Sequence, residues 1–455
     1  MIKNILKVLT SNFLVLIIGI INGFFIPKIL SINEYANYSL FSLYVSYIVA
    51  LHLGFPTGLF IKYGGTDYNK IDKKQYKSEL IVIYSILIFF TAIGIFIGMF
   101  LKLKLFVYVS LAILPVCVVG SYKSLYQAWG MFSKYSKLNG LVPFSIVTCL
   151  LLFYSLKGNI SSDVMIMIYL SIYLFFSIVI SIQEYKFVDG VRATKIISKE
   201  NWEIEKIGFA IMAGNYINVL FHSLDRMFIN ILFTKGNFAM YSFAMQMQIV
   251  MTLFLSAISQ PLYYKLSLKN RNCNFVFIKE LLLLFGSLSG SAYFVCSMAV
   301  KLFLPKYLES LNIISIYFAA FPVIAIITAL YINLYKINKL IKEYVRTLVI
   351  MTLLAFILNS LGVFFLGNYL IIALCTTIVY YFWFFYSAKH FDEIDINSKD
   401  RLFLVGFLIL FFTITRNFSG FIGMIVFTTL MSIFGFLLYK NTFKEIVRMI
   451  IKANK

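Results

Sequence analysis

The stretch HSLDRMFINILFTKGNFAMYS, residues 222–242, places two adjacent charged residues, Asp225 and Arg226, inside a segment that is otherwise apolar. On either side of its TKG turn, residues 207–233 and 238–260 are each long and apolar enough to cross a bilayer, which takes roughly 20 residues. The stretch therefore predicts two antiparallel transmembrane helices joined by a short turn. A charge deep in a membrane costs at least about 2.5–3.5 kcal/mol, so the pair must be buried against protein or face a water-filled cavity.

The whole chain has the composition of a membrane protein. Of its 455 residues, 61% are hydrophobic and 13% are charged, whereas soluble domains have about 25% charged residues. Its five cysteines show neither metal-ligand nor disulfide spacing, so we predict no bound metal and no cofactor. The chain is basic, with 40 Lys and Arg against 19 Asp and Glu, which in a soluble protein would suggest a nucleic-acid partner.

The position of the basic residues argues against nucleic acid. Of the 40 Lys and Arg residues, 31 lie in segments predicted to be cytoplasmic, 8 in predicted outer segments, and Arg226 within a span. This is the positive-inside pattern of a multi-pass membrane protein with both termini in the cytoplasm. It supports fourteen predicted transmembrane helices, at about 12–30, 38–60, 79–101, 104–121, 138–156, 164–182, 207–233, 238–260, 280–304, 311–335, 345–366, 369–388, 402–415 and 418–439.

The two halves of the chain are related by an internal repeat. A shift of 203 residues aligns the first two predicted helices with the seventh and eighth, with these identical pairs: Asn12 and Asn215, Phe25 and Phe228, Ile26 and Ile229, Ala36 and Ala239, Tyr38 and Tyr241, Ser39 and Ser242. Because the shift spans six helices, the two halves have the same orientation in the membrane. Such a parallel repeat is typical of transporters whose substrate binds between two bundles.

We therefore predict an all-α polytopic membrane protein of two six-helix lobes followed by two further helices. The predicted parts are an N-terminal lobe at 1–185, a cytoplasmic linker at 186–206, a C-terminal lobe at 207–390, two helices within 391–439 and a basic amphipathic tail at 440–455.

The charged pair belongs to a polar stripe on the seventh predicted helix. Polar residues recur there at intervals of three and four, which places them on one helical face. The eighth helix and the repeat position of Asp225 in the first helix add further polar residues. The candidate cavity residues are Asp225, Arg226, His222, Asn218, Asn215, Asn230, Asn22, Gln248 and Thr252.

Two interpretations of the stripe stay open. Asp225 and Arg226 either hold helices together through hydrogen bonds, or handle a substrate or ion directly. Because neighbouring residues lie about 100° apart around a helix, one of the two side chains can face a cavity while the other meets a neighbouring helix. Tyr residues within spans, such as Tyr317, Tyr331 and Tyr380, could stack on sugar rings. The GxxxG pairs, such as Gly94 with Gly98, predict close helix packing.

An enzymatic function finds little support in the sequence. No span contains paired carboxylates, a metal-binding cluster, or a nucleophile with its base. The predicted outer loops are too short to fold into a catalytic domain, and no loop has a nucleotide-binding motif. We therefore predict that the protein is not an enzyme.

Four segments of the sequence carry a resemblance to a known family: LDRMFINILFTKGNFAMYSFA, GFFIPKILSINEYANYSLF, LGFPTGLFIKY and LFLPKYLES. Together they resemble the Wzx-type polysaccharide-export flippases of the multidrug/oligosaccharidyl-lipid/polysaccharide superfamily. LDRMFINILFTKGNFAMYSFA (224–244) is similar to the family's Asp-Arg pair in helix 7 followed by Tyr-Ser in helix 8. GFFIPKILSINEYANYSLF (23–41) resembles its first hairpin. LGFPTGLFIKY (53–63) resembles the end of its second helix, and LFLPKYLES (302–310) the segment after its ninth.

This resemblance implies a flippase of a bacterial inner membrane that works by alternating access. Its substrate would be an undecaprenyl-diphosphate-linked oligosaccharide repeat unit, used for O-antigen or capsular polysaccharide. Arg226 would meet the diphosphate or the glycan, and Asp225 would carry a coupling proton or balance Arg226. Protons or sodium are candidate coupling ions, and a polysaccharide polymerase with its chain-length machinery is a candidate partner.

Two alternatives stay open. The chain could be an ion-coupled multidrug antiporter of the multidrug and toxic compound extrusion type, related by superfamily. However, drug-exporting relatives often have an acidic residue in helix 1, where this chain has Asn22. It could also be a membrane scaffold subunit of an envelope-assembly complex.

Overall fold

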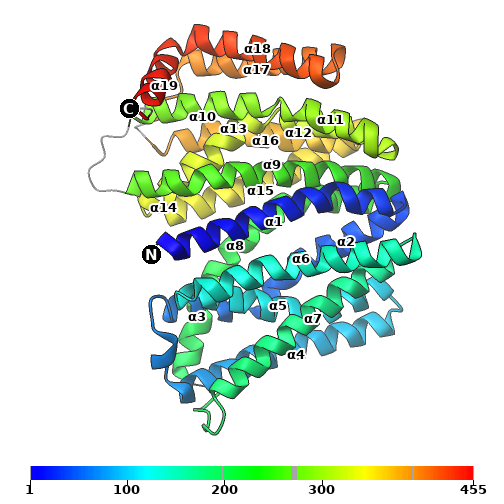
Figure 1. Cartoon of the computed structure of the whole chain (residues 1–455), viewed down its shortest axis with the longest axis vertical. Coiled ribbons are helices and arrows are strands. Elements are labelled where there is room, and N and C mark those ends of the chain that lie inside the picture. The colour runs from blue at the N-terminus through cyan, green and yellow to red at the C-terminus, as the bar shows by residue number, and fades with distance from the viewer. Residues whose placement is uncertain (1, 197, 268–273, 392–393, 454–455) are drawn as a thin grey trace. The chain divides into compact units, whose positions relative to one another are not determined.

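The protein is built from α-helices. A computed structural model describes residues 2–196, 198–267, 274–391 and 394–453, and within these ranges it contains helices and no strand (Figure 1). Among the described residues, eleven helices are long and apolar enough to cross a membrane, and up to thirteen spans result if each of two bent helix pairs is counted as one. The prediction of an all-α polytopic membrane protein is therefore confirmed.

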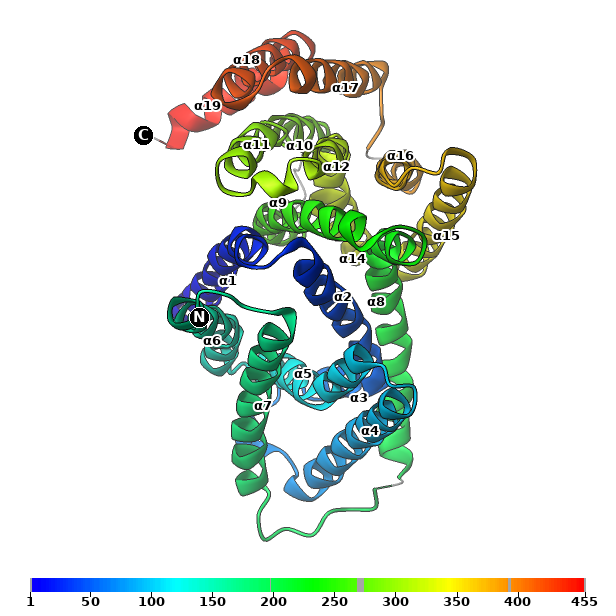
Figure 2. The same cartoon turned by 90° about the vertical axis from the view of Figure 1, so that its right-hand side faces the viewer.

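The chain divides into two compact units, Met1–Ser223 and Leu224–Lys455. The division falls within α8 (Lys199–Leu232), a single helix of 34 residues that continues from the first unit into the second (Figure 2). The domain limits that we expect from the sequence, with a linker at 186–206, stay a prediction.

Unit 1 consists of six predicted spans and the first part of α8. Its helices are α1 (Ile2–Ile29), α2 (Ile32–Ile48), α3 (Phe55–Lys62), α4 (Lys73–Phe100), α5 (Lys104–Ala128), α6 (Phe132–Lys157) and α7 (Ser162–Phe187). The sequence predicts one span at 38–60, and in the structure this segment consists of α2 and α3, which are bent by 60° relative to each other. The bend follows from the backbone at Leu53 and Gly54, whose φ values of 54° and 91° cannot continue a right-handed helix.

Unit 2 contains the end of α8 and the remaining helices. They are α9 (Lys235–Ser267), α10 (Phe275–Ser289), α11 (Ala292–Phe303), α12 (Ser310–Phe318), α13 (Phe321–Ile326), α14 (Ile332–Ile337), α15 (Ile341–Leu366), α16 (Leu370–Ala388), α17 (Ser398–Asn417), α18 (Gly420–Leu438) and α19 (Lys440–Ala453). Helices α10 and α11 together form one apolar span, and the span containing α12, α13 and α14 is bent by 51°. The tail forms the helix α19, as the sequence predicts.

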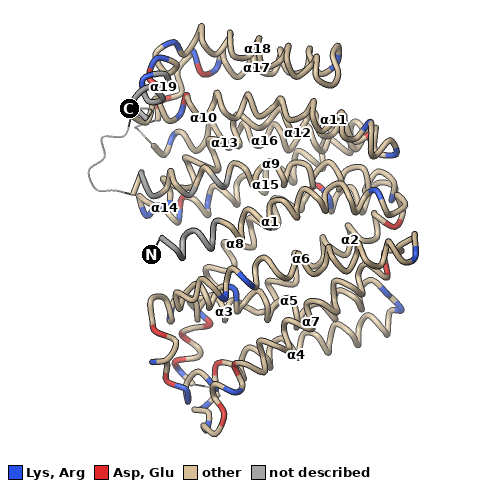
Figure 3. Tube along the Cα trace, viewed as in Figure 1, with Lys and Arg blue, Asp and Glu red and all other residues tan. Residues whose placement is uncertain are grey.

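Each of the fourteen predicted spans coincides with a helix or a helix pair, but α17 is not among the candidate membrane spans. Charged residues lie at both ends of this 20-residue helix, Lys399, Asp400 and Arg401 at one end and Arg416 at the other. They leave it a shorter apolar stretch than the other spans have. In the described part of the chain, Lys and Arg gather at helix ends and in the segments between helices (Figure 3).

The helix ends repeat at the interval that the sequence identities give. Helix α1 ends at Ile29 and α8 ends at Leu232, 203 positions later. Helix α2 begins at Ile32 and α9 begins at Lys235, again 203 positions later. The shared spacing shows that the identities between the halves mark equivalent places in two similar helical hairpins.

Close packing in unit 1 explains one pair of small residues. A side-chain carbon added at Gly94 would lie 2.5 Å from Oγ of Ser110, and one added at Gly98 would lie 2.8 Å from Cγ2 of Val107. Both contacts are far shorter than packing allows. The GxxxG pair therefore lets α4 and α5 approach, as the sequence predicts.

Candidate functional site

Asp225 lies in the interior of unit 2 and is only 3% exposed. It projects from α8 toward four other helices of the unit, each of which supplies one hydrogen-bond donor. The donors are Tyr241 on α9, Tyr317 on α12, Asn359 on α15 and Thr376 on α16. We call Asp225 and these four residues the Asp225 cluster.

Each carboxylate oxygen of Asp225 accepts two hydrogen bonds. Oδ1 accepts from Nδ2 of Asn359 at 2.9 Å and from Oγ1 of Thr376 at 2.7 Å. Oδ2 accepts from the hydroxyls of Tyr317 at 2.7 Å and Tyr241 at 3.0 Å. A buried carboxylate is tolerated only with such compensation. The cluster thus satisfies Asp225 and ties α8 to the rest of the unit.

The two tyrosines of the cluster also contact each other. Their hydroxyl oxygens lie 2.6 Å apart, and either can be the donor. Together with Oδ2 of Asp225 they form a triangle of three short oxygen–oxygen contacts. All four donors of the cluster are uncharged side chains, so the cluster solvates the carboxylate with dipoles.

The other predicted residues of the stripe on α8 differ from Asp225 in burial. Asn215 and His222 are exposed, whereas Asn218, Arg226 and Asn230 are half-buried. Of the remaining candidates, Gln248 is buried, and Asn22 and Thr252 are half-buried. Thr252 donates a local hydrogen bond to the backbone carbonyl of Ile249. Of the two neighbouring charges, it is Asp225 whose side chain turns into the unit. The role of all nine candidates in a substrate cavity stays a prediction.

The repeat position of Asp225 has no comparable set of partners. Asn22 on α1 has a buried Oδ1 that accepts no hydrogen bond from the described residues. Tyr38 stands at the repeat position of Tyr241, but Leu114 stands 203 positions before Tyr317. The cluster is therefore a feature of unit 2 that the repeat does not duplicate.

Sequence reasoning singled out Asp225, and named Tyr241 only as a repeat identity and a motif residue, but it missed Asn359 and Thr376. These residues lie 134 and 151 positions from Asp225 along the chain, and no local pattern distinguishes them from other polar residues within spans. Tyr317 was considered as a surface for sugar stacking, whereas its ring is fully buried. Tyr331 and Tyr380 are also buried, so these three rings do not offer a face to a sugar here.

Unit 1 has a buried carboxylate of its own, which joins three helices. Glu79 on α4 accepts a hydrogen bond from the hydroxyl of Tyr63 at 2.6 Å and forms an ion pair with Lys62 on α3 at 2.6 Å. Lys62 also pairs with Glu200 at the start of α8. Nearby, Glu184 accepts from Tyr68 at 3.0 Å. Burial and the neighbouring Glu184 raise the pKa of Tyr68, which keeps this hydroxyl protonated as a donor.

The two helices α17 and α18 are tied to the rest of unit 2 by a buried ion pair. Lys279 on α10 pairs with Asp400 on α17, and both side chains are almost fully buried. The hydroxyl of Tyr439, just after α18, donates to the other oxygen of Asp400 at 2.8 Å. These contacts hold the ends of α10, α17 and α18 together, and we assign them a role in stability. Among the described residues, no group of three or more His, Cys, Asp and Glu side chains could hold a metal ion.

The fold is similar to that of a solved transporter. The structure of the lipid II flippase MurJ in an inward closed conformation matches 99% of this chain and 100% of its own, with a TM-score of 0.63 and 18% sequence identity. No known family model and no curated protein matches the sequence. The similarity therefore establishes a fold that a lipid II flippase also has.

Proposed function

We propose that this protein is a flippase that moves an undecaprenyl-diphosphate-linked oligosaccharide from the inner to the outer leaflet of a bacterial inner membrane. The proposal is supported by the fold, which a lipid II flippase shares, and by the Asp-Arg motif at 225 and 226. O-antigen or capsular polysaccharide is the proposed destination of the oligosaccharide. A polysaccharide polymerase is the proposed partner that receives it.

The observation that carries the proposal is the Asp225 cluster. An acid that is fully buried among neutral donors is costly to maintain and marks ion or proton pathways in membrane proteins. If the residue served packing alone, an apolar side chain of similar size would stabilise the protein at least as well. We infer that the carboxyl group is retained because its charge state changes during transport.

The hydrogen count within the cluster favours a proton as the coupling ion. The triangle of Oδ2, Tyr241 and Tyr317 has three contacts of 2.6–3.0 Å. Each phenol carries one hydrogen, so an ionised Asp225 leaves two hydrogens for three contacts. One proton bound to Oδ2 supplies the missing hydrogen and completes the triangle. The cluster therefore has room for one proton without any rearrangement of its heavy atoms.

Proton binding at Asp225 would act on α8. Its final turns, within 224–232, belong to unit 2, and its earlier turns belong to unit 1. A change in the hydrogen bonds that hold Asp225 alters how firmly α9, α12, α15 and α16 fix the end of this shared helix. Alternating access requires such a coupling between an ion-binding event and an element common to both units.

Arg226 is the proposed contact for the diphosphate. It follows Asp225 on α8, about 100° further around the helix, and is half-buried as a residue, with its Nε among the buried atoms. A guanidinium binds phosphate oxygens in a bidentate manner and stays charged at any physiological pH. Substrate and proton would thus be sensed at neighbouring positions of one helix.

The test of the transport function is deletion of the protein followed by location of the lipid-linked oligosaccharide. We expect the oligosaccharide to accumulate in the inner leaflet, protected from a glycan-cleaving reagent added outside, while surface polysaccharide is lost. Unchanged surface polysaccharide with increased drug sensitivity would overturn the proposal and favour a drug antiporter.

Coupling is tested separately with purified protein in sealed vesicles. Adding the lipid-linked oligosaccharide should move protons across the vesicle membrane with the wild-type protein and not with Asp225→Asn. Transport of the oligosaccharide without proton movement would retain the flippase and refute proton coupling. Replacement of sodium by potassium should leave transport unchanged, and a requirement for sodium would also refute it.

A further inference from the structure

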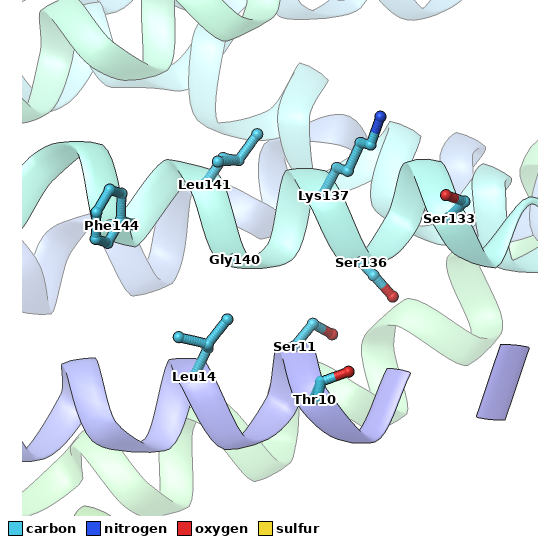
Figure 4. A pocket seen from close by; sticks show the side chains of 9 residues that line it. All are labelled: Thr10, Ser11, Leu14, Ser133, Ser136, Lys137, Gly140, Leu141 and Phe144. Carbon is cyan, nitrogen blue, oxygen red and sulfur yellow. The ribbon is translucent and has the colours of Figure 1, made fainter. Parts of the chain in front are cut away.

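Unit 1 has a groove between α1 and α6 that no proposed transport step uses. It has a volume of about 670 Å³ and belongs to unit 1, whereas the Asp225 cluster belongs to unit 2. Three residues of α1 and six of α6 line it: Thr10, Ser11, Leu14, Ser133, Ser136, Lys137, Gly140, Leu141 and Phe144 (Figure 4).

The groove changes from polar to apolar along its length. The two helices run in the same direction, so the hydroxyls of Thr10 and Ser11 lie beside those of Ser133 and Ser136 at one end (Figure 4). Leu14, Leu141 and Phe144 lie toward the other end (Figure 4). A ligand that fits this gradient has a polar head and an apolar tail.

The polar end lies at the depth of a lipid headgroup. Thr10 precedes the end of α1 at Ile29 by 19 residues, and Lys137 precedes the end of α6 at Lys157 by 20 residues. At 1.5 Å per residue, both positions lie about 30 Å from the opposite ends of their helices. This distance equals the thickness of the hydrocarbon core of a bilayer. The lysine distribution predicts that this end faces the cytoplasm, so the leaflet is the inner one.

Two features at the polar end favour an anion. The hydroxyl of Ser136 points from α6 toward α1 (Figure 4), is buried, and forms no hydrogen bond with a described residue. Helix α6 begins after Met131 without a side-chain cap, so its first amide groups face the same end. Uncapped helix N-termini attract negative charge.

The cation of the groove is Lys137. The neighbouring Lys134 is engaged elsewhere, because its ammonium lies 5.3 Å from the ring centres of both Tyr68 and Tyr126. Lys137 is exposed on the rim and has a flexible stem that can place its ammonium at headgroup level. One lysine with hydroxyl groups matches the single charge of a phosphodiester better than the greater charge of a diphosphate.

We propose that this groove binds one anionic phospholipid of the inner leaflet, with a single negative charge such as that of phosphatidylglycerol. Lys137 and the hydroxyls around Ser136 hold the headgroup phosphate, and an acyl chain follows Leu14, Leu141 and Phe144 past Gly140. The bound lipid lies along the groove that α1 and α6 form, and these helices also contact each other directly through Asn139 and Asn12. It is distinct from the transported lipid-linked oligosaccharide, and the inference stands whether or not the proposed transport function is correct.

Gly140 allows a variant that fills the groove without disturbing the protein. A side-chain carbon at this position would meet no atom within 4 Å, so Gly140→Leu places its side chain in the space of the acyl chain. Leu also favours a helix more than Gly does, so the variant should fold. Gly120→Leu is the matched control, because position 120 is an equally open helix position on α5 outside the groove.

Lys137→Gln removes the charge at the polar end, and Lys157→Gln is its control at the far end of the same helix. One lysine near an anionic headgroup contributes enough attraction for about fivefold in affinity. The full-length protein in mild detergent is titrated with phosphatidylglycerol or phosphatidylethanolamine of identical chains, and bound lipids are counted by native mass spectrometry.

We expect the wild-type protein to retain one phosphatidylglycerol in preference to phosphatidylethanolamine. Gly140→Leu should lose this lipid, Lys137→Gln should bind it about fivefold more weakly, and both controls should match wild type. Retention of the lipid by Gly140→Leu would refute the site, and equal binding of both lipids would refute its charge selectivity. Displacement of the lipid by equimolar lipid-linked oligosaccharide would also overturn the proposal, because the groove would then be a substrate site.

Discussion

Replacing Asp225 by Asn and by Ala should separate its structural role from its role in transport. Asn has nearly the same shape as a protonated Asp. Its Oδ1 can still accept from Asn359 and Thr376, and its Nδ2 can donate to the hydroxyls of Tyr241 and Tyr317, which also accept. Asp225→Asn therefore keeps a hydrogen bond in every contact of the cluster and leaves one phenol hydrogen without an acceptor, so it should change stability by only about 1 kcal/mol.

Asp225→Ala removes all four acceptor contacts of the carboxylate. The two tyrosine hydroxyls can still pair with each other across 2.6 Å, which leaves Asn359 and Thr376 without a partner. A buried polar group without a partner costs about 1–3 kcal/mol, so we expect a loss of about 2–6 kcal/mol. Because of this loss of stability, the amount of Asp225→Ala protein in the membrane should also be lower.

The assay measures both properties for each variant. Stability is followed as the temperature at which detergent-solubilised protein leaves the monodisperse peak in size-exclusion chromatography. Transport is followed as lipid-linked oligosaccharide reaching the outer leaflet per amount of membrane protein. We expect Asp225→Asn to melt like wild type and to lose transport, and Asp225→Ala to melt several degrees lower.

Two results would refute this reasoning. Full transport by Asp225→Asn would show that the charge state of the residue does not change during the cycle. Wild-type stability of Asp225→Ala would show that the four hydrogen bonds do not hold α8 within unit 2. The two results are independent, because one concerns the charge and the other the hydrogen bonds.

Three further predictions concern the fold. Lys279→Met leaves Asp400 as a buried charge without its cation and should lower the free energy of unfolding by about 3–5 kcal/mol, measured as a lower melting temperature. Recovery of the melting temperature in the double variant Lys279→Met, Asp400→Asn would identify the unpaired charge as the cause, and no recovery would contradict this explanation. Gly94→Ala places a carbon 2.5 Å from Oγ of Ser110 and should lower the free energy of unfolding by about 1–3 kcal/mol, whereas Gly120→Ala should not lower it. Equal melting temperatures of the two variants would contradict the close packing of α4 and α5. A reporter that is active only in the cytoplasm should be active when fused to the C-terminus, and activity only outside would reverse the predicted topology.

Much of the fold could be predicted because the membrane imposes simple rules. Span length and apolarity located all fourteen helical segments, and the repeat of 203 residues even matches the ends of α1 and α8. The bend between α2 and α3 was missed, because hydropathy is insensitive to backbone conformation. Its local signals were present as Gly54 and Pro56, and the left-handed conformation of Leu53 appears only in the structure.

The site was predicted only in part, for a physical reason. A charge within an apolar span stands out from its neighbours, so Asp225 could be found from the sequence. Its partners Asn359 and Thr376 are uncharged and cost little in a span, and their pairing depends on helices that meet only in three dimensions. The same limit applies to Glu79 and Asp400, which lie near helix ends and resemble ordinary exposed carboxylates in sequence.

If the proposed transport function is correct, the difference between the two units indicates where a proton gradient can act on the protein. The repeat aligns the neutral Asn22 of unit 1 in sequence with the acidic Asp225 of unit 2, within two hairpins whose helix ends have the same spacing. An amide cannot gain or lose a proton at physiological pH, so only the unit 2 position can respond to a proton gradient. Because Asp225 stands on α8, the one helix that both units share, a single titrating group is sufficient to act on both. We therefore expect that Asn22→Asp would not restore transport to Asp225→Asn, since no described residue donates a hydrogen bond to Oδ1 of Asn22.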